Sequence, residues 1–107
     1  MNEQIENRVI SFLGLCMRAG RIISGQEACV DLVRQNEAAL VLMDAGASDN
    51  TRKRLTDACH SHGAPLYELS DGALGQAIGK KGRMVVALKN DGMAQKLLTA
   101  LEGEPRL

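Results

Sequence analysis

A glycine- and lysine-rich segment near the C-terminal end has residue types and spacing that suit a polyanion. Three cations fall within four positions, and glycines stand on either side of the first two. Glycines allow a phosphate to approach the main chain closely, and the cations attract it. The segment is therefore a candidate nucleic-acid grip, phosphate loop or ordinary turn. Its members are Ile78, Gly79, Lys80, Lys81, Gly82 and Arg83.

The flanking sequence argues against three familiar glycine-rich sites. A P-loop needs a serine or threonine after its lysine, but Lys81 stands at that position. A dinucleotide-binding loop follows a strand and precedes a helix, and the order expected here is the reverse. The Gly-X-X-Gly clamp of KH domains has the right spelling, but it joins two helices, and the run "RMVVAL" after Gly82 is typical of a strand. What remains is a helix-to-strand loop, either a solvated connection or a phosphate contact.

The stretch "SGQEA" at 24–28 is a second candidate. Gly25 stands at the expected entry of a helix, where main-chain N–H groups are free to bind a ligand. Gln26 and Glu27 add an amide and a carboxylate, which can hydrogen-bond to the edges of bases. Many helix starts share some of these features, so a solvated helix start stays open as the alternative.

Other reactive residues do not form a catalytic set. Cys59, His60 and His62 are close in sequence but give too few ligands for a metal site, and histidines also suit the end of a helix. Cys16 and Cys29 fall on apolar helix faces, which indicates buried thiols. The three bases of "TRKRL" at 51–55 fit either a solvated face or a phosphate-contacting patch. We expect no catalytic residue, no metal and no cofactor.

Composition limits the class of protein. The chain has 107 residues, with thirteen basic and thirteen acidic side chains, and only Phe12 and Tyr67 are aromatic. This size predicts a single domain over 1–107. The charge balance argues against coating of nucleic acid by bulk charge, and the lack of rings argues against a base-stacking sheet. The absence of a signal peptide or a long apolar run, together with three unpaired cysteines, favours a cytoplasmic protein without a membrane partner.

Hydrophobic periodicity predicts an α/β fold with the element order αβαβαβαβα. Helices alternate with apolar strands, so we expect a three-layer α/β/α sandwich around a four-stranded mixed sheet. The second helix should bury Ala28, Cys29, Leu32 and Val33, the third should be capped by Asp49 or Asn50, and the fourth by Ser70. Order is expected over about 1–102 and a loose tail over 103–107. The expected helices are 3–19, 25–35, 51–60, 70–79 and 90–101, and the expected strands are 21–24, 38–43, 66–69 and 84–89.

Taken together, these stretches resemble a known family over about residues 10–100. "IISGQEA", "ALVLM" and "YELSDGALGQAIGKKGRMVVAL" look like the kink-turn RNA-binding ribosomal protein family of the archaeal and eukaryotic large subunit, and most closely its bacterial YlxQ-type members. The most telling pieces are the glycine before the second helix and the "LG-x-A-x-G" run at 74–79.

The resemblance implies which residues meet RNA. Gly25 would allow close approach of the main chain, and Gln26 and Glu27 would meet guanine edges of G·A pairs. Ile78 would make an aliphatic contact with a flipped-out base, and the loop 79–83 would contact phosphates. Four positions depart from the family pattern: Gln26 stands for an asparagine, Val30 for a lysine, and Ala45-Gly46 for an acidic pair. These departures favour general structured-RNA binding over strict kink-turn specificity.

The resemblance therefore implies a non-enzymatic RNA-binding protein that is associated with the ribosome or translation. Its expected partner is structured RNA, including ribosomal RNA, and no small-molecule substrate is expected. The alternative is a protein-interaction adaptor on the same scaffold that has lost RNA affinity, which the neutral charge and Val30 favour. An enzyme that uses Cys59 or His62 is the third hypothesis, but no base, nucleophile and orienting group can be placed together. The oligomeric state does not follow from the sequence.

Overall fold

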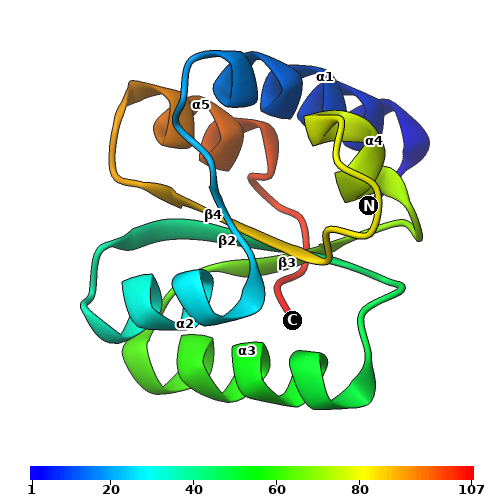
Figure 1. Cartoon of the computed structure of the whole chain (residues 1–107). Coiled ribbons are helices and arrows are strands. Elements are labelled where there is room, and N and C mark those ends of the chain that lie inside the picture. The colour runs from blue at the N-terminus through cyan, green and yellow to red at the C-terminus, as the bar shows by residue number, and fades with distance from the viewer.

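The computed structural model describes residues 1–107 as a four-stranded sheet with helices against both faces (Figure 1). The predicted order αβαβαβαβα is confirmed, and so is the three-layer α/β arrangement. The elements are α1 (Glu3–Arg18), β1 (Ile23–Ser24), α2 (Gln26–Arg34), β2 (Ala38–Asp44), α3 (Asp49–His62), β3 (Leu66–Leu69), α4 (Ala73–Ile78), β4 (Val85–Lys89) and α5 (Gly92–Ala100).

The sheet has the strand order β1-β4-β2-β3 and is mixed, as expected. β2 and β3 are parallel, whereas β4 runs antiparallel to both of its neighbours. The central strands β2 and β4 are the two longest apolar runs of the sequence, and most of their residues are buried. This burial follows from their place between two layers of helices, because a strand covered on both faces has no polar side.

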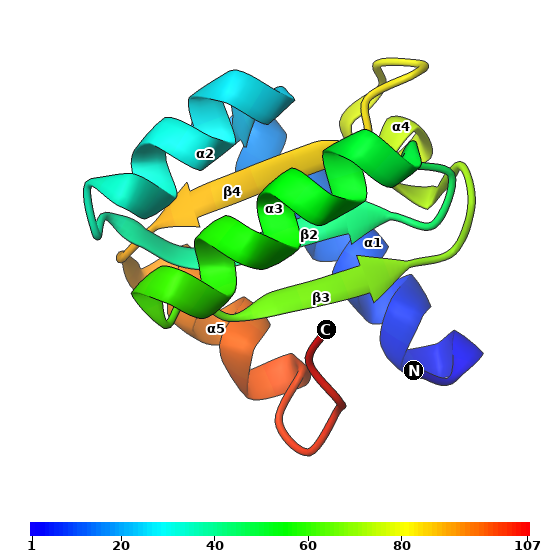
Figure 2. The ribbon, with the colours of Figure 1, turned by 90° about the horizontal axis from the view of Figure 1, so that it is seen from below.

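The core is divided in two by the sheet. Alternate side chains of a strand point to opposite faces, so Leu40 and Leu42 pack with α1, α4 and α5, while Val41 and Met43 pack with α2 and α3. Figure 2 shows α2 and α3 lying across the second face. No helix is both long and apolar enough to cross a bilayer.

The beginnings of two helices differ from the sequence prediction. α3 is capped by Ser48, whose side chain accepts the N–H of Thr51, and not by Asp49 or Asn50. α4 is preceded by Gly72 with a left-handed φ of 85°, and not by Ser70. The N–H of Ser70 instead donates to a carboxylate oxygen of Glu6 at 3.1 Å. A different carboxylate, that of the buried Asp44 at the end of β2, binds the N–H groups of Gly72 and Leu74, which removes the need for a local cap.

The C-terminal residues lie against β3 and do not form the expected loose tail (Figure 2). The N–H of Leu107 donates to the carbonyl of Leu66 at 2.8 Å, and His60 Nε2 lies 2.9 Å from the Leu107 main-chain oxygen. Arg106 Nε donates to the hydroxyl of Tyr67 at 3.4 Å. The composition of the C-terminal residues does not predict these contacts, because the partners lie on α3 and β3, which are distant in sequence.

Candidate nucleic-acid interface

The pairing of β1 with β4 brings the two predicted halves of the site together. Ser24 is opposite Val86, and the N–H of Gly25 donates to the carbonyl of Val85 at 3.1 Å. A Cβ atom placed on Gly25 would lie 3.7 Å from Arg83 Nη1. The entry of α2 and the loop that precedes β4 therefore form one continuous surface.

Gly25 is required at the entry of α2 by its main-chain conformation. Its φ is 103° and its ψ is 150°. Residues other than glycine rarely adopt these main-chain angles. No side chain caps this helix. The first N–H groups of α2 are thus free of a side-chain cap.

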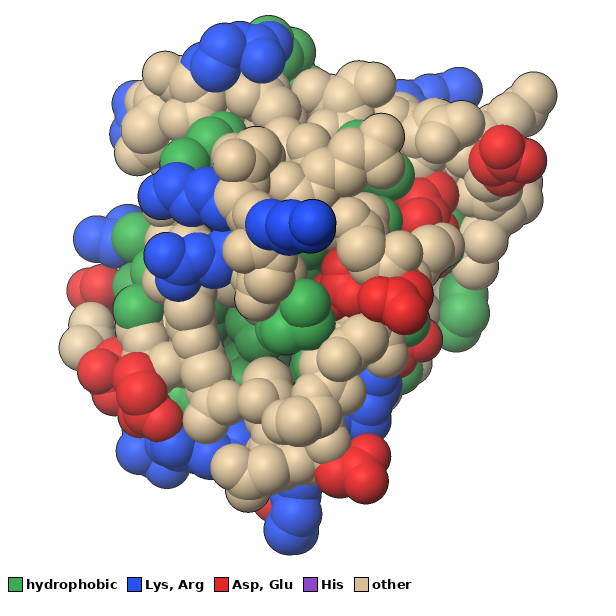
Figure 3. All heavy atoms as spheres, turned by 45° about the vertical axis from the view of Figure 1, so that its right-hand side comes forward, with side chains coloured by type: hydrophobic (Ala, Val, Ile, Leu, Met, Phe, Trp, Pro, Cys, Tyr) green, Lys and Arg blue, Asp and Glu red, His purple; other side chains and the backbone are tan.

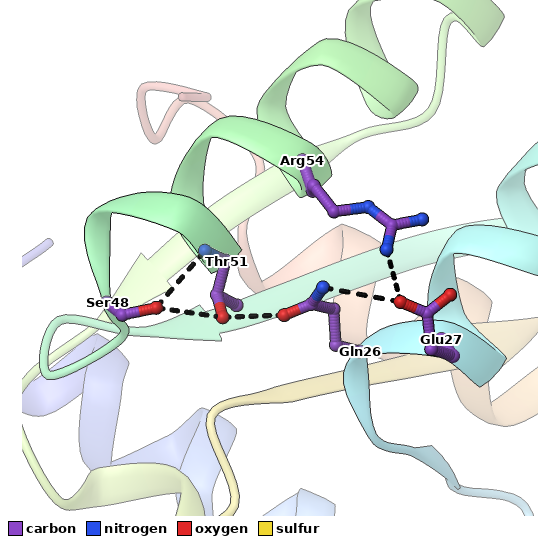
Figure 4. Close-up of polar contacts among 5 residues, drawn as sticks. All are labelled: Gln26, Glu27, Ser48, Thr51 and Arg54. Carbon is purple, nitrogen blue, oxygen red and sulfur yellow. Dashed lines mark hydrogen bonds and ion pairs between the residues drawn. The ribbon is translucent and has the colours of Figure 1, made fainter.

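Gln26 and Glu27 lie next to α3 rather than standing alone (Figure 4). Thr51 Oγ1 donates to Gln26 Oε1 at 2.6 Å, and Arg54 forms an ion pair with Glu27. The side chain of Glu27 is 67% exposed, so its carboxylate stays open to a partner. The sequence placed these two residues at the site but gave no sign of their partners on α3.

The loop between α4 and β4 presents exposed cations. Lys80, Lys81 and Arg83 are exposed and none of them forms an ion pair. Gly79 and Gly82 have φ values of 72° and 82°, which the loop needs to turn back toward β4. The loop rests on α4, because a Cβ atom on Gly75 would lie 3.1 Å from the carbonyl oxygen of Lys80.

A hollow of about 410 Å³ lies beside this loop. Figure 3 views the side of the molecule where α4, the loop and the start of α3 lie, and blue Lys and Arg side chains gather there beside a hollow with green hydrophobic atoms. Acidic side chains lie on the other side of that hollow. The residues that line the hollow of the loop are Gly72, Gly75, Gln76, Gly79, Lys81, Gly82, Arg83 and Met84.

Ile78 is buried, so its side chain does not offer the exposed aliphatic surface that the resemblance implied. Its side chain is 6% exposed and belongs to the core cluster under α1. α4 has six residues and is anchored by its apolar side chains, so Ile78 is needed inside. Met84 is half-buried and lines the hollow, which makes it the aliphatic side chain available at the loop.

The predicted buried face of α2 needs one correction, which also changes the meaning of Val30. Ala28 is exposed, whereas Val30 is 1% exposed and packs with Cys29 and Val33. Valine is larger and more apolar than alanine, and Val30 rather than Ala28 lies on the buried face of the helix. Val30 is therefore a core residue in this chain.

The bases of "TRKRL" are each paired within the chain. Arg52 binds Glu68 and donates to the carbonyl of Ala45, Lys53 lies 3.2 Å from Asp57, and Arg54 pairs with Glu27. The helix start thus carries three bases that are compensated by nearby carboxylates. Exposed pairs of this kind add little stability.

Asp44 is a buried site residue that the sequence argument missed. It is 0% exposed, and its carboxylate accepts the N–H groups of Gly46, Gly72 and Leu74 at 2.8, 3.0 and 3.2 Å. These bonds tie the end of β2 to the start of α4, which carries the cationic loop. The only signal in the sequence was one acidic residue at the end of an apolar strand.

Gly46 explains part of the departure from the acidic pair of the family. A Cβ atom at this position would lie 2.6 Å from Asp71 Oδ1 and 3.1 Å from Asp44 Oδ1. A side chain here would have to move the exposed Asp71 carboxylate and would crowd the Asp44 carboxylate that holds α4. Glycine at position 46 avoids this crowding.

The cysteines and histidines do not form a reactive site. Burial, and then the nearby Cys59, raises the pKa of Cys29 to about 12, and burial raises the pKa of Cys59 to about 11. Burial, with Asp91, also raises the pKa of Cys16. His62 Nδ1 lies 3.1 Å from Asn36 Oδ1. No group of three His, Cys, Asp or Glu side chains is placed to hold a metal ion.

This scaffold matches a known class of protein. The chain belongs to the ribosomal protein L7Ae/L30e/S12e/Gadd45 family, whose sequence model matches residues 8–98. This confirms the resemblance stated from the sequence. The family match and the relatives described next also support the expectation that the chain is not an enzyme.

Two curated relatives share a name with each other. The chain is 40% identical over 91 residues to the RNA-binding protein YlxQ of Bacillus subtilis, which covers 84% of this chain and 91% of that protein. It is 35% identical over 104 residues to the RNA-binding protein YlxQ of Enterococcus faecium, which covers 96% of this chain and 100% of that protein.

Solved structures share the fold. A protein of unknown function from Bacillus halodurans superimposes with a TM-score of 0.80 at 33% identity, over 89% of this chain and 97% of that one. The 15.5kD RNA binding protein of Giardia lamblia superimposes with a TM-score of 0.73 at 19% identity, over 94% of this chain and 92% of that one. The second likeness is one of fold alone.

Proposed function

We propose that this protein binds structured RNA of the kink-turn kind through a surface made of two parts. One part is the α2 entry, which we define as Gly25, Gln26 and Glu27. The other is the cationic loop, residues 79–83. The observation that carries the proposal is the approach of Arg83 to Gly25, because it joins the two parts into one surface. The names of the curated relatives support RNA as the ligand.

The two parts suit different parts of a bent RNA. Gln26 and Glu27 can exchange hydrogen bonds with base edges, and a carboxylate accepts the N–H groups on the Watson–Crick edge of guanine. Lys80, Lys81 and Arg83 are exposed and unpaired, as phosphate contacts require. Met84 lines the hollow beside the loop and offers an aliphatic wall to a base that has left its stack.

The neutral charge of the chain is compatible with this proposal. Thirteen basic and thirteen acidic residues cancel, so long-range attraction to RNA is small. Binding then depends on local cations and on a shape that a plain duplex does not offer. We expect the affinity for a folded RNA to exceed the affinity for nucleic acid in general.

A gel-shift titration with three RNAs tests the proposal. A kink-turn RNA should bind more tightly than a plain duplex or a single strand of the same length. The triple variant Lys80→Glu, Lys81→Glu, Arg83→Glu should lose this binding, and log affinity of the wild type should fall with log salt at a slope of roughly 2 to 3 for about three phosphate contacts. Equal binding of all three RNAs by the wild type would refute the proposal.

We infer that the bound RNA belongs to the translation machinery, with ribosomal RNA as the first candidate. The description of the family, which names ribosomal proteins, supports this assignment. Crosslinking in cells followed by sequencing of the attached RNA tests it. Co-purification before and after ribonuclease treatment tests the adaptor alternative, because an adaptor would keep its partner after the RNA is digested.

A further inference from the structure

A chain of hydrogen bonds links the first turn of α3 to the α2 entry (Figure 4). Ser48 Oγ lies 3.2 Å from the main-chain nitrogen of Thr51 and 3.1 Å from Thr51 Oγ1. Thr51 Oγ1 lies 2.6 Å from Gln26 Oε1. The residue that caps α3 is therefore connected to a side chain proposed to read RNA.

The direction of this chain follows from what each group can donate. The amide oxygen of Gln26 carries no proton, so the Thr51 hydroxyl donates to it. The oxygen of Ser48 already accepts the main-chain N–H of Thr51, and its own proton is donated to Thr51 Oγ1. Each hydroxyl proton thus has one acceptor. The two hydroxyl hydrogen bonds therefore point the same way, from Ser48 to Thr51 and from Thr51 to Gln26.

This direction fixes which groups the α2 entry shows to solvent. Because Gln26 Oε1 faces α3, the amide nitrogen faces Glu27 and lies 3.4 Å from Glu27 Oε1. The same carboxylate oxygen pairs with Arg54, and Glu27 Oε2 has no hydrogen-bond partner. The surface therefore offers one free N–H of Gln26 beside one free carboxylate oxygen of Glu27.

We propose that Ser48 and Thr51 are positioning residues that fix this order of donor and acceptor and thereby select guanine. The inference rests on the proposed function. The O6 atom of guanine accepts a hydrogen bond from the Gln26 amide N–H, while the N1–H of guanine donates a hydrogen bond to Glu27 Oε2. A reversed Gln26 amide would place its oxygen against O6, and two acceptors would face each other.

The test uses substitutions that change the chain of hydrogen bonds and leave the fold intact. Thr51→Val removes the hydroxyl but keeps the shape of the side chain and the main-chain N–H that Ser48 caps. Thr51→Ser restores the hydroxyl. Thr56→Val makes the same chemical change on α3 at a half-buried residue that has no hydrogen bond to α2. It is the matched control.

The probe is a kink-turn RNA with either guanine or 2-aminopurine at each G·A guanine in turn. 2-Aminopurine keeps the amino group that the G·A pair uses but lacks O6 and the N1 proton. The wild type, Thr51→Ser and Thr56→Val should prefer guanine at one position by about 10-fold, and Thr51→Val should reduce this ratio to about 2-fold. The reduction should come mainly from weaker binding of the guanine RNA.

A second measurement is made on the protein without RNA. In Thr51→Val the side-chain amide signals of Gln26 in a ¹H–¹⁵N NMR spectrum should move, whereas in Thr56→Val they should not. Unchanged Gln26 signals in Thr51→Val, or a full guanine preference in that variant, would overturn the inference and leave RNA binding intact. A wild type without preference for kink-turn RNA would overturn the proposed function and this inference with it.

Discussion

Arg83 Nη1 lies close to the main chain of Gly25, at 3.7 Å from the point where a Cβ atom would stand. One residue directly precedes α2, and the other closes the loop before β4. The pairing of β1 with β4 sets this approach, because the N–H of Gly25 is bonded to the carbonyl of Val85. A change at either position therefore acts on both halves of the proposed surface.

The substitution Gly25→Ala should lower the free energy of unfolding by about 1–2 kcal/mol, since φ of 103° is strained for alanine. Gly92→Ala is the control, because Gly92 lacks a positive φ and has open space around it. Urea denaturation followed by circular dichroism measures both. Equal stability of Gly25→Ala and the wild type would show that the main chain at the α2 entry can relax.

Replacement of Asp44 by asparagine should destabilise the fold by about 2–3 kcal/mol, because hydrogen bonds to a charged acceptor are lost and an N–H₂ group faces N–H donors. Asp57→Asn removes an exposed partner of Lys53 and should change stability by less than about 0.5 kcal/mol. Hydrogen exchange of the Gly72 and Leu74 amides tests the position of the damage. Protection of these amides that matches the wild type would contradict the role given to Asp44.

Truncation of Ile78 separates a core role from a contact role. Ile78→Ala should cost about 2–4 kcal/mol of stability, because the side chain is buried under α1. Leu15→Ala, at a position that is 47% exposed, should cost less than about 1 kcal/mol. Thermal and urea unfolding supply the values. A loss of RNA affinity by Ile78→Ala with full stability would restore Ile78 as a contact residue.

Stability should fall at alkaline pH through the buried thiols. The pKa of Cys29 rises from 9.0 to about 12 on folding, and that of Cys59 from 9.0 to about 11. Well below pH 9 both thiols are protonated in either state. As pH rises from about 9 toward the folded values, only the unfolded chain loses these protons, so the folded state is progressively disfavoured.

Urea unfolding at pH 7, 9 and 10.5 measures this effect. The double variant Cys29→Ala, Cys59→Ala should be less stable at pH 7 because of the lost side-chain volume, but its decline above pH 9 should be shallower. An identical decline in both proteins would assign the pH dependence to other groups.

The sequence was informative where local pattern decides structure. Apolar spacing located the first two helices, and capping and glycine signals located the other three. The runs at 38–43 and 84–89 located the two central strands, because burial on both faces requires a continuous apolar run. The family resemblance pointed to Gly25 and the cationic loop. The main-chain conformation at Gly25 agrees with the need for glycine there.

Partners that come from distant segments could not be predicted in this way. Asp44 binds the start of α4 from the end of β2, so Ser70 is not needed as a cap. Thr51 and Arg54 bind the α2 entry across the gap between two helices. Ile78 belongs to the loop motif in sequence, but the six-residue α4 needs its side chain for packing in the core, which a local motif does not show.

The position of the C-terminal residues has a consequence for self-association. An unpaired strand at the border of a sheet is a template on which another chain can add, with aggregation as the result. At one border β1 has only two residues, and at the other the Leu107 N–H occupies the Leu66 carbonyl of β3. The C-terminal residues thus use one of the main-chain groups on which another strand could pair, and removal of residues 103–107 should increase aggregation at high protein concentration.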